Sequence, residues 1–323
     1  MIRTRAWTAL VFILALPGVA SAQGSTWPAA QPIKLIVPFS AGSGTDSIAR
    51  IVADQVGTQI NQTFVVDNRV GAGGVIGVNA VAKAEPDGYT LLFHSSTYTV
   101  TPAINTSLPY DAVKDLAAVI PVANLPSVLV TPPGKYKSVK DLVDAAKARP
   151  GALNYASAGA GSAAHLNAER FKLAAKFEAQ HVPFKGGPEA LREIVADRVD
   201  FYFVPLAVAR GLIQEGKLAA LAVSSTQRVA ALPDVPTTVE AGYPNSEYIF
   251  WMGLFAPAKT PAPILERLHK EFAAAIANPA VVEKLAKLGA EPMKMSATEF
   301  GALITREVKS NTELVQQAGI KVN

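Results

Sequence analysis

The chain alternates between short apolar runs and segments with helical periodicity. Residues 33–37 form a largely apolar run, which predicts a buried β-strand. Apolar residues then recur three or four positions apart over residues 48–60, which predicts an amphipathic helix. Between them lies a glycine-rich segment, residues 38–46. The order is therefore strand, glycine-rich loop and helix, and we expect Thr45 or Asp46 to cap the helix.

The same alternation continues to the end of the chain. Short apolar runs predict further strands, and apolar residues at helical spacing predict the helices between them. The further strands are expected at 64–66, 89–93, 128–131, 153–156, 178–182, 199–204, 219–223 and 250–256, and the further helices at 75–84, 138–148, 163–174, 189–196, 208–215, 263–277, 280–288 and 297–315. Two segments, 113–126 and 233–244, are interpreted as crossings between two α/β units.

These elements predict an α/β protein with two lobes. We expect residues 23–124 and 245–323 to form lobe 1 and residues 125–244 to form lobe 2. In each lobe one strand leads into a glycine-rich loop and a helix, at residues 38–46 and again at residues 157–162. Ligands of open α/β sheets bind at the carboxyl ends of the strands, so both loops are expected at a cleft. Two lobes that face each other across a cleft can close on a small molecule.

Residues 1–22 have the features of a signal peptide. Two arginines precede an apolar run at residues 7–16, and Ala20-Ser21-Ala22 provides a small-residue cleavage site. We therefore expect cleavage after Ala22 and a soluble, exported mature chain that begins at Gln23 and resides in the periplasm. A retained membrane anchor is the alternative, although the apolar run is short for a segment that spans a bilayer.

Composition and charge argue against several classes of partner and chemistry. Removal of two arginines with the leader lowers the formal net charge from +4 to +2, and no basic run stands out, which argues against nucleic acid as a partner. The chain has no cysteine and therefore no disulfides or thiolate metal ligands. Its four histidines form no His-x-x-x-His pair, which argues against a catalytic metal site. We expect no cofactor.

The loop at residues 38–46 offers unpaired main-chain N–H groups beside the positive end of a helix dipole. This geometry favours an anion, either a phosphate or a carboxylate. A P-loop requires a lysine where Thr45 follows Gly44, and a dinucleotide fingerprint requires a third glycine where Ser47 stands, so the loop matches neither motif. Asp46 would also repel a polyphosphate. The alternative is a tight turn that only lets the helix pack on its sheet.

Candidate ligand-binding residues come from the two glycine-rich loops, one strand end and one lysine. They are Phe39, Ser40, Ala41, Gly42, Ser43, Gly44, Thr45 and Asp46 in the first loop, Ser95, Ser96 and Thr97 after a predicted strand, Ser157, Ala158, Gly159, Ser162, Ala163 and His165 in the second loop, and Lys185. The hydroxyls at 95–97 can contact the far end of a ligand or belong to a solvated loop. Lys185 can pair with a second carboxylate or form a surface or inter-lobe salt bridge.

Asp46, Ser162 and His165 each have more than one interpretation. Asp46 is expected to cap the helix and brace the loop rather than contact the ligand, because it would repel a carboxylate. Ser162 can donate to the ligand or act only as an N-cap of its own helix. His165, three residues further along, can orient the loop, donate to the ligand or pack as a structural histidine.

Short motifs occur in a fixed order along nearly the whole mature chain. They are Pro32-Ile33-Lys34, Pro38-Phe39 through Asp46 to Arg50, Asp67-Asn68-Arg69, Gly71-Ala72-Gly73-Gly74, Pro86-Asp87-Gly88-Tyr89, Gly159-Ala160-Gly161-Ser162 to His165-Leu166, Val182-Pro183-Phe184-Lys185-Gly186, Leu232-Pro233-Asp234-Val235-Pro236-Thr237, Glu240-Ala241-Gly242 and Trp251 to Pro257. This set resembles the Bug/TctC family, the extracytoplasmic solute-binding proteins of tripartite tricarboxylate transporters. Ser43 departs from the pattern, because the family usually has a second glycine there.

The resemblance implies a two-lobed, type II periplasmic binding protein (Venus flytrap) fold. It also implies that main-chain amides and waters hold a ligand carboxylate between residues 39–46 and residues 157–165. The ligand would be a dicarboxylate, a citrate-like acid, an acidic amino acid or an aromatic acid. The partners would be the membrane permease subunits of a tripartite transporter, and we expect a monomer. A ligand-sensing module for a sensor kinase shares this fold and is the alternative.

Catalytic motifs are missing from the glycine-rich loops. The Gly-x-Ser-x-Gly nucleophile motif does not occur in the sequence, and Gly161-Ser162 is followed by two alanines. No pair of carboxylates stands beside a predicted loop in a way that suggests acid–base chemistry. We therefore expect a protein that captures its ligand without chemistry and is not an enzyme, with an exported hydrolase as the remaining alternative.

Overall fold

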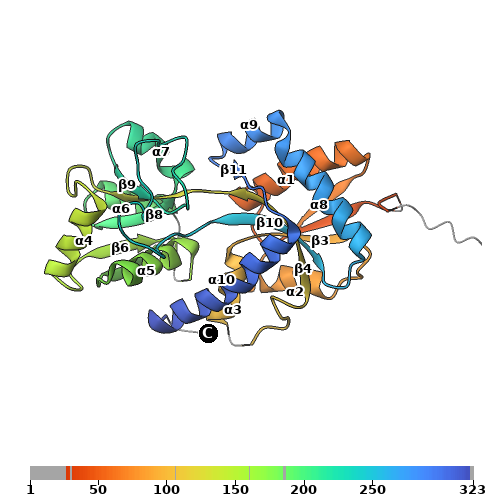
Figure 1. The fold of residues 1–323 in the computed structure, drawn as a ribbon, viewed down its shortest axis with the longest axis horizontal. Coiled ribbons are helices and arrows are strands. Elements are labelled where there is room, and N and C mark those ends of the chain that lie inside the picture. The colour runs from red at the N-terminus through yellow and green to blue at the C-terminus, as the bar shows by residue number, and fades with distance from the viewer. Residues whose placement is uncertain (1–26, 30, 106, 160, 185–186, 321–323) are drawn as a thin grey trace, which may run out of the picture.

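The computed structural model describes residues 27–29, 31–105, 107–159, 161–184 and 187–320. The expected signal peptide at residues 1–22 and the candidate residue Lys185 lie outside this part of the chain. Within the described residues, no helix combines the length and the apolar character that crossing a bilayer requires. The chain forms two lobes, one built on a six-stranded sheet and the other on a five-stranded sheet (Figure 1).

The first sheet contains the strand that leads into the first glycine-rich loop. Its strands are β1 (Ile33–Val37), β2 (Phe64–Asn68), β3 (Thr90–Ser95), β4 (Leu116–Asn124), β10 (Trp251–Pro257) and β11 (Glu291–Pro292). Their order across the sheet is β11-β4-β10-β3-β1-β2. Strand β1 runs parallel to both of its neighbours, β2 and β3, whereas β10 runs antiparallel to β3 and β4.

The second sheet repeats this layout around the second loop. Its strands are β5 (Ser127–Thr131), β6 (Asn154–Ser157), β7 (Gln180–Pro183), β8 (Phe201–Pro205) and β9 (Ala219–Val223), in the order β7-β6-β8-β5-β9. Strand β6 runs parallel to both of its neighbours, and β5 runs antiparallel to β8 and β9. The loops that follow β1 and β6 therefore occupy equivalent positions in the two lobes.

Helices cover both faces of each sheet. They are α1 (Gly44–Ile60), α2 (Val75–Ala82), α3 (Thr97–Ile104), α4 (Val139–Ala148), α5 (Ala163–Ala175), α6 (Gly187–Val195), α7 (Leu206–Gln214), α8 (Ala262–Ala277), α9 (Pro279–Lys287) and α10 (Ala297–Gln317), with a 3-10 turn, η1, at Ala72–Gly74. In lobe 1, α1, α8 and α9 bury one face of the sheet, and α2, α3 and α10 bury the other. In lobe 2, α4 and α5 pack on one face, and α6 and α7 pack on the other. Burial of both faces explains the continuous apolar runs of the strands.

The structure confirms the two-lobed α/β fold, but the two predicted crossing segments are not crossings along most of their length. Residues 116–124 are strand β4 of the first sheet. Its apolar pattern was misinterpreted because Pro121 stands inside it, and a proline normally argues against a central strand. In the structure Pro121 lies beside a register shift between β4 and β10, where the regular ladder is already interrupted.

The return crossing lies further along the chain than expected. Residues 233–244 stay with the second sheet, where the Thr238 N–H donates to the Val223 carbonyl at 2.9 Å. Their prolines suggested a linker, but their apolar side chains pack on the lobe 2 core. The chain returns beside its outward connection, where the Leu125 N–H donates to the Phe250 carbonyl at 2.9 Å.

Helix α5 joins lobe 2 to lobe 1. Leu166 of α5 shares a buried cluster with Val100 of α3 and with residues of α10, and these three helices lie together in Figure 1. Arg170 of α5 donates to the Asn311 side-chain oxygen at 3.1 Å, and the Asn311 amide donates to Thr99 Oγ1 at 3.1 Å. The helix that follows the second glycine-rich loop is therefore anchored to the other lobe.

Candidate functional site

The first glycine-rich loop is closed by Ser43 and Asp46. Ser43 has an extended backbone, with φ −66° and ψ 160°, and its Oγ accepts the N–H of Asp46 at 3.3 Å, so Ser43 is the N-cap of α1. Asp46 lies in the first turn, and its Oδ2 accepts the N–H of Gly42 at 2.8 Å. The prediction of Thr45 or Asp46 as the cap is therefore wrong, because the cap lies earlier. The expectation that Asp46 braces the loop is confirmed.

Arg50 and Asn68 hold the Asp46 carboxylate in place. Arg50 Nε contacts both carboxylate oxygens, at 3.0 and 3.1 Å. The Asn68 amide donates to Asp46 Oδ1 at 2.8 Å and to the Phe39 carbonyl at 2.9 Å. Burial acts to raise the pKa of Asp46, but the hydrogen bonds from Arg50, Asn68 and Gly42 outweigh it and hold the pKa below its usual value. Asp46 is thus a paired carboxylate.

The second loop repeats the hydrogen-bonding pattern of the first. Ser162 is the N-cap of α5, with φ −68° and ψ 159°, and its Oγ accepts the N–H of His165 at 3.3 Å. His165 Nδ1 accepts the N–H of Gly161 at 3.0 Å. Gly161 has φ +73° and Gly42 has φ +80°, a conformation that favours glycine in both loops. The two loops are therefore built alike although their bracing residues differ.

Each loop leaves main-chain N–H groups free at a helix N-terminus. Among the described residues, the N–H groups of Gly44 and Thr45 at the start of α1 have no hydrogen-bond partner, and the same holds for Ala163 and Ala164 at the start of α5. A Cβ built on Gly44 meets no atom within 4 Å, so the space beside this helix end is open. Partial positive charge at the two helix ends makes both positions suited to an anion.

The remaining candidates of the first loop are placed at its surface and its base. Ser40, Ala41 and Gly42 are exposed, whereas Thr45 is buried within the first turn of α1. Phe39 is half-buried and packs edge-to-face on His94, with 5.1 Å between the ring centroids. Phe39 therefore supports the base of the loop.

Ser157 and His165 of the second loop are occupied by the protein itself. The buried Ser157 Oγ accepts the N–H of Gly159 and donates to the carbonyl of Gly159, both at 3.0 Å. His165 is 5% exposed, and its Nδ1 holds Gly161. Both side chains shape the loop from behind, while Ala158 is exposed beside it.

The polar run at residues 95–97 is not the loop that its composition suggested. Ser95 ends β3, Ser96 is the cap position of α3, and Thr97 begins that helix. Ser95 and Ser96 are buried, and Ser95 Oγ donates to Thr97 Oγ1 at 3.2 Å. The hydroxyl-rich pattern indicated a loop because α3 is short and contains Pro102, which breaks the usual signs of a helix.

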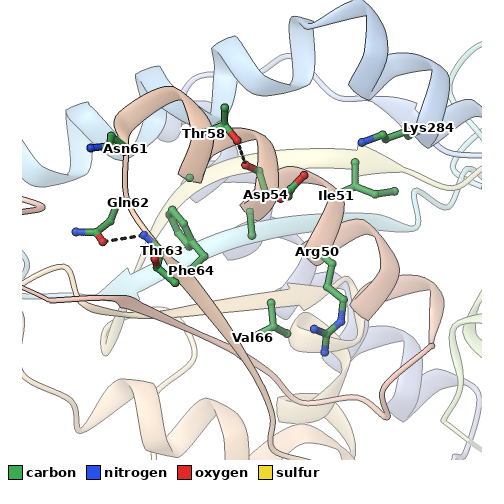
Figure 2. Close-up of a pocket in the computed structure, with 12 residues that line it drawn as sticks. Arg50, Ile51, Asp54, Thr58, Asn61, Gln62, Thr63, Phe64, Val66 and Lys284 are labelled. Atoms are coloured by element: carbon green, nitrogen blue, oxygen red, sulfur yellow. Dashed lines mark hydrogen bonds between the residues drawn. The ribbon is translucent and has the colours of Figure 1, made fainter.

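A separate pocket lies beside the first loop. Figure 2 shows this pocket, of about 730 Å³, on the outer side of α1, between that helix, the start of β2 and Lys284 of α9. Arg50 lines it and also braces Asp46, but neither glycine-rich loop contributes a residue to it. The pocket and the anion-suited helix ends are therefore different places.

The structure brings in three residues to which sequence reasoning gave no role. Arg50 and Asn68 occur in motifs that identified the resemblance, and that was the only signal for them. His181 lies on β7, and its Nε2 is 2.6 Å from Ser157 Oγ. No sequence spacing connects His181 to the second loop, because β6 and β7 become neighbours only in the sheet.

Known proteins resemble this chain along nearly its whole length. BugT of Bordetella pertussis is 35% identical over 323 residues, which cover 99% of this chain and 99% of BugT. A solved R. palustris protein with adipate is 32% identical with a TM-score of 0.76, and the match covers 92% of this chain and 100% of that one. MatC from Rhodopseudomonas palustris with bound malate is 29% identical with a TM-score of 0.72, over 89% of this chain and 99% of MatC.

A family model supports the same relationship. Residues 48–320 match the tripartite tricarboxylate transporter family receptor, TctC. Solved relatives include a periplasmic binding protein, BugD. The prediction of a binding protein rather than an enzyme is confirmed by this membership, and the hydrolase alternative is set aside. The chain belongs to the TctC family of tripartite tricarboxylate transporter receptors, the Bug proteins.

Proposed function

We propose that this chain captures a small carboxylic acid, foremost a dicarboxylate, between its two lobes and delivers it to the membrane permease subunits of a tripartite tricarboxylate transporter. The observation that carries the proposal is the pair of equivalent loops, each with two main-chain N–H groups at a helix N-terminus that have no hydrogen-bond partner among the described residues. Relatives solved with adipate and with malate support the same class of ligand.

The chemistry of the loops favours a carboxylate over a more highly charged anion. Residues 39–46 contain no lysine or arginine, and neither do residues 157–165. Main-chain N–H groups and helix dipoles can balance a single negative charge, but a polyphosphate would be left without a cationic partner. We propose that one carboxylate accepts N–H groups from both loops.

A ligand held in this way favours closure. The carboxylate would contact lobe 1 through α1 and lobe 2 through α5, so its full set of hydrogen bonds forms only when the lobes approach each other. For the other end of a dicarboxylate we propose Thr97, which is half-buried at the start of α3, because Ser95 and Ser96 are buried. Lys185 stays a prediction from the sequence. We propose that lobe 1 and lobe 2, divided where the two connections meet near Leu125 and Phe250, are the moving bodies of a monomer.

Export follows from the same proposal. The mature chain would begin at Gln23 after removal of residues 1–22 and would bind its ligand in the periplasm. A sensor-kinase role would use the same pocket, and deletion of the permease subunits separates the two. Loss of uptake after this deletion supports transport, whereas a signalling response that survives it and depends on this chain supports sensing.

A ligand screen tests the proposal directly. The mature chain is titrated with adipate, malate, citrate, glutamate, benzoate and terephthalate, and binding is measured by thermal shift and calorimetry. A ligand at about 100 times its Kd should stabilise the chain by about 2.7 kcal/mol, which is a clear rise in Tm. A folded chain that binds none of these acids would contradict the proposal.

Gly44 allows the contribution of one N–H group to be tested alone. Gly44→Pro removes the N–H at the first helical position, where proline fits the helix and Ser43 already has the extended backbone that proline requires before it. Gly44→Ala keeps the N–H and adds only a methyl group in open space. We expect Gly44→Pro to weaken binding by about tenfold to a hundredfold and Gly44→Ala to change it less than threefold.

A further inference from the structure

Two histidine rings stack behind the second glycine-rich loop. The rings of His165 from α5 and His181 from β7 are 3.9 Å apart between centroids and 7° from parallel. Tyr155 of β6 stacks on His181 at 5.0 Å. The imidazole pair is therefore fixed between helix α5 and the sheet.

Each ring holds a different glycine of the loop. His165 Nδ1 accepts the N–H of Gly161 at 3.0 Å. His181 Nε2 is 2.6 Å from Ser157 Oγ, and that oxygen also accepts the N–H of Gly159. The Ser157 hydroxyl and His181 Nε2 share one proton in this contact, and the tautomer of His181 decides which of the two donates it. Both glycines are thus tied to imidazoles.

Burial keeps both imidazoles neutral, and the charged groups around the pair do not reverse this effect. On α5, Glu169 Oε1 lies 3.9 Å from His165 Nε2, but it already accepts from Lys172 at 2.7 Å and from the Tyr155 hydroxyl. Burial, with a smaller effect of Lys172, lowers the pKa of His165 to about 4. Burial and the neighbouring His165 lower the pKa of His181 to about 4 as well.

We propose that His181 is a positioning residue for the anion site: it does not touch the ligand, but it fixes the second loop through Ser157 and through its stack on His165. The proposal rests on the proposed function for its meaning in binding. The first loop is braced by a carboxylate, that of Asp46, whereas the second loop is braced by imidazoles. A neutral imidazole holds the second loop without adding a second negative charge beside an incoming anion.

The arrangement has a direct consequence for acid conditions. A proton on His165 Nδ1 would turn the acceptor of the Gly161 N–H into a donor, and the loop would lose its brace. Two stacked imidazolium rings would also repel each other. The affinity for a carboxylate that stays ionised should therefore be constant from pH 8 to about pH 5.5 and fall below that range.

The first experiment uses the ligand-free mature chain. His181→Phe keeps an aromatic ring in the stack but removes the nitrogen that bonds Ser157, and His181→Gln keeps a side-chain amide that can donate or accept. Exchange of the Gly159 amide with solvent should rise about tenfold in His181→Phe and stay within threefold of wild type in His181→Gln. Exchange of the Gly42 amide is the internal reference. His269→Gln, at a partly buried position of α8, is the control variant.

Folding is kept separate from positioning by a second variant. Ser157→Ala removes the hydroxyl that contacts His181 and accepts the Gly159 N–H, and it leaves the ring of His181 in place. It should therefore raise exchange of the Gly159 amide as His181→Phe does. Unchanged Gly159 exchange in a folded His181→Phe chain overturns the proposal. If His181→Phe does not fold, unchanged exchange in Ser157→Ala overturns it instead.

The second experiment measures adipate binding at pH 7.5 and pH 5, with the Kd at each pH expressed for the adipate dianion because the carboxyl groups of the ligand titrate in the same range. We expect the Kd to rise about tenfold in His181→Phe and less than threefold in His181→Gln, at temperatures where both are folded. Altered Gly159 exchange in a wild-type chain that binds no acid would leave the loop assignment standing and contradict the proposed function. Tight adipate binding with no effect of His181→Phe on Kd or on exchange would contradict the role of His181 alone.

Discussion

Asp46 and His165 occupy the same position in two different loops: each lies in the first turn of its helix and accepts the N–H of the glycine four residues earlier, at 2.8 Å and 3.0 Å. The serine between glycine and helix caps the helix in both cases. A carboxylate and an imidazole therefore perform one structural task. The two residues differ in charge at neutral pH, where Asp46 is a carboxylate and His165 is a neutral imidazole.

Replacement of Asp46 separates its charge from its role as an acceptor. Asp46→Asn retains an oxygen for the Gly42 N–H, whereas Asp46→Ala removes the acceptor of both the Gly42 N–H and Arg50 Nε. Asp46→Ala should lower the free energy of unfolding by about 2 kcal/mol and weaken adipate binding, because the buried carboxylate and the hydrogen bonds that it accepts from Gly42, Arg50 and Asn68 are lost. Denaturant unfolding and calorimetry measure the two effects. Equal effects of the two substitutions would show that only the charge matters.

The second loop offers a matched deletion of one main-chain N–H. Ala163→Pro removes the N–H at the first position of α5, and Ser162 has the extended backbone that suits a following proline. The double variant Gly44→Pro/Ala163→Pro should lose less binding free energy than the sum of the losses in the two single variants, because one carboxylate is proposed to contact both loops. Calorimetry with adipate gives the double-mutant cycle. Strict additivity would instead place separate carboxylates on the two loops.

Two buried histidines, His94 and His165, and the half-buried His181 should make the fold sensitive to acid. Burial lowers the pKa of His94, His165 and His181 to about 4 in the folded chain, well below their usual value. Between pH 4 and the usual histidine pKa of about 6.5, the unfolded chain binds protons that the folded chain does not. The free energy of unfolding is therefore constant above about pH 6.5 and falls as the pH drops towards 4.

Thermal unfolding across this range measures the effect. We expect Tm to fall by roughly 5 °C or more between pH 6.5 and pH 4.5. Glu307 acts in the opposite sense, since burial raises its pKa, and it moderates the change. His181→Phe should show a smaller loss of Tm over the same range. A pH-independent Tm in the wild-type chain would contradict neutral, buried imidazoles.

Arg170 should control how firmly the lobes are joined in the absence of ligand. Its guanidinium bonds Asn311 of α10 and lies 5.7 Å from the ring centre of Tyr248. Arg170→Met keeps an apolar stem of similar length but removes the donor and the cation, which should cost about 1–2 kcal/mol of stability. The radius of gyration of the ligand-free chain, measured by small-angle scattering, should increase. An unchanged radius would assign the inter-lobe contact to apolar packing alone.

The glycine-rich loops could be predicted because their signal is local. A strand, a glycine-rich turn and a helix start are adjacent in the sequence, so residues 38–46 and residues 157–162 were placed correctly at the ends of β1 and β6. The exact cap could not be predicted in the same way. Ser43 and Asp46 are both good capping residues, and only the backbone conformation shows which of them precedes the first turn.

The bracing residues could not be predicted because they come from distant strands. Asn68 reaches Asp46 from the end of β2, and His181 reaches Ser157 from β7. Both contacts depend on strand pairing, that of β1 with β2 and that of β6 with β7. The spacing of residues along the sequence does not indicate either pairing. Strand β4 was not predicted for another reason. Pro121 lies within it, and a proline usually indicates that a segment is not a central strand.

Recognition by main-chain groups has a consequence for how such receptors diversify. The free N–H groups of Gly44, Thr45, Ala163 and Ala164 exist whatever side chains surround them, provided that the loops keep their shape. Ser43 is compatible with that shape because it caps the helix. Substitutions elsewhere in the cleft can therefore change which acid fits while the grip on its charged end persists. A lineage of these receptors can acquire new nutrients without rebuilding the part that captures them.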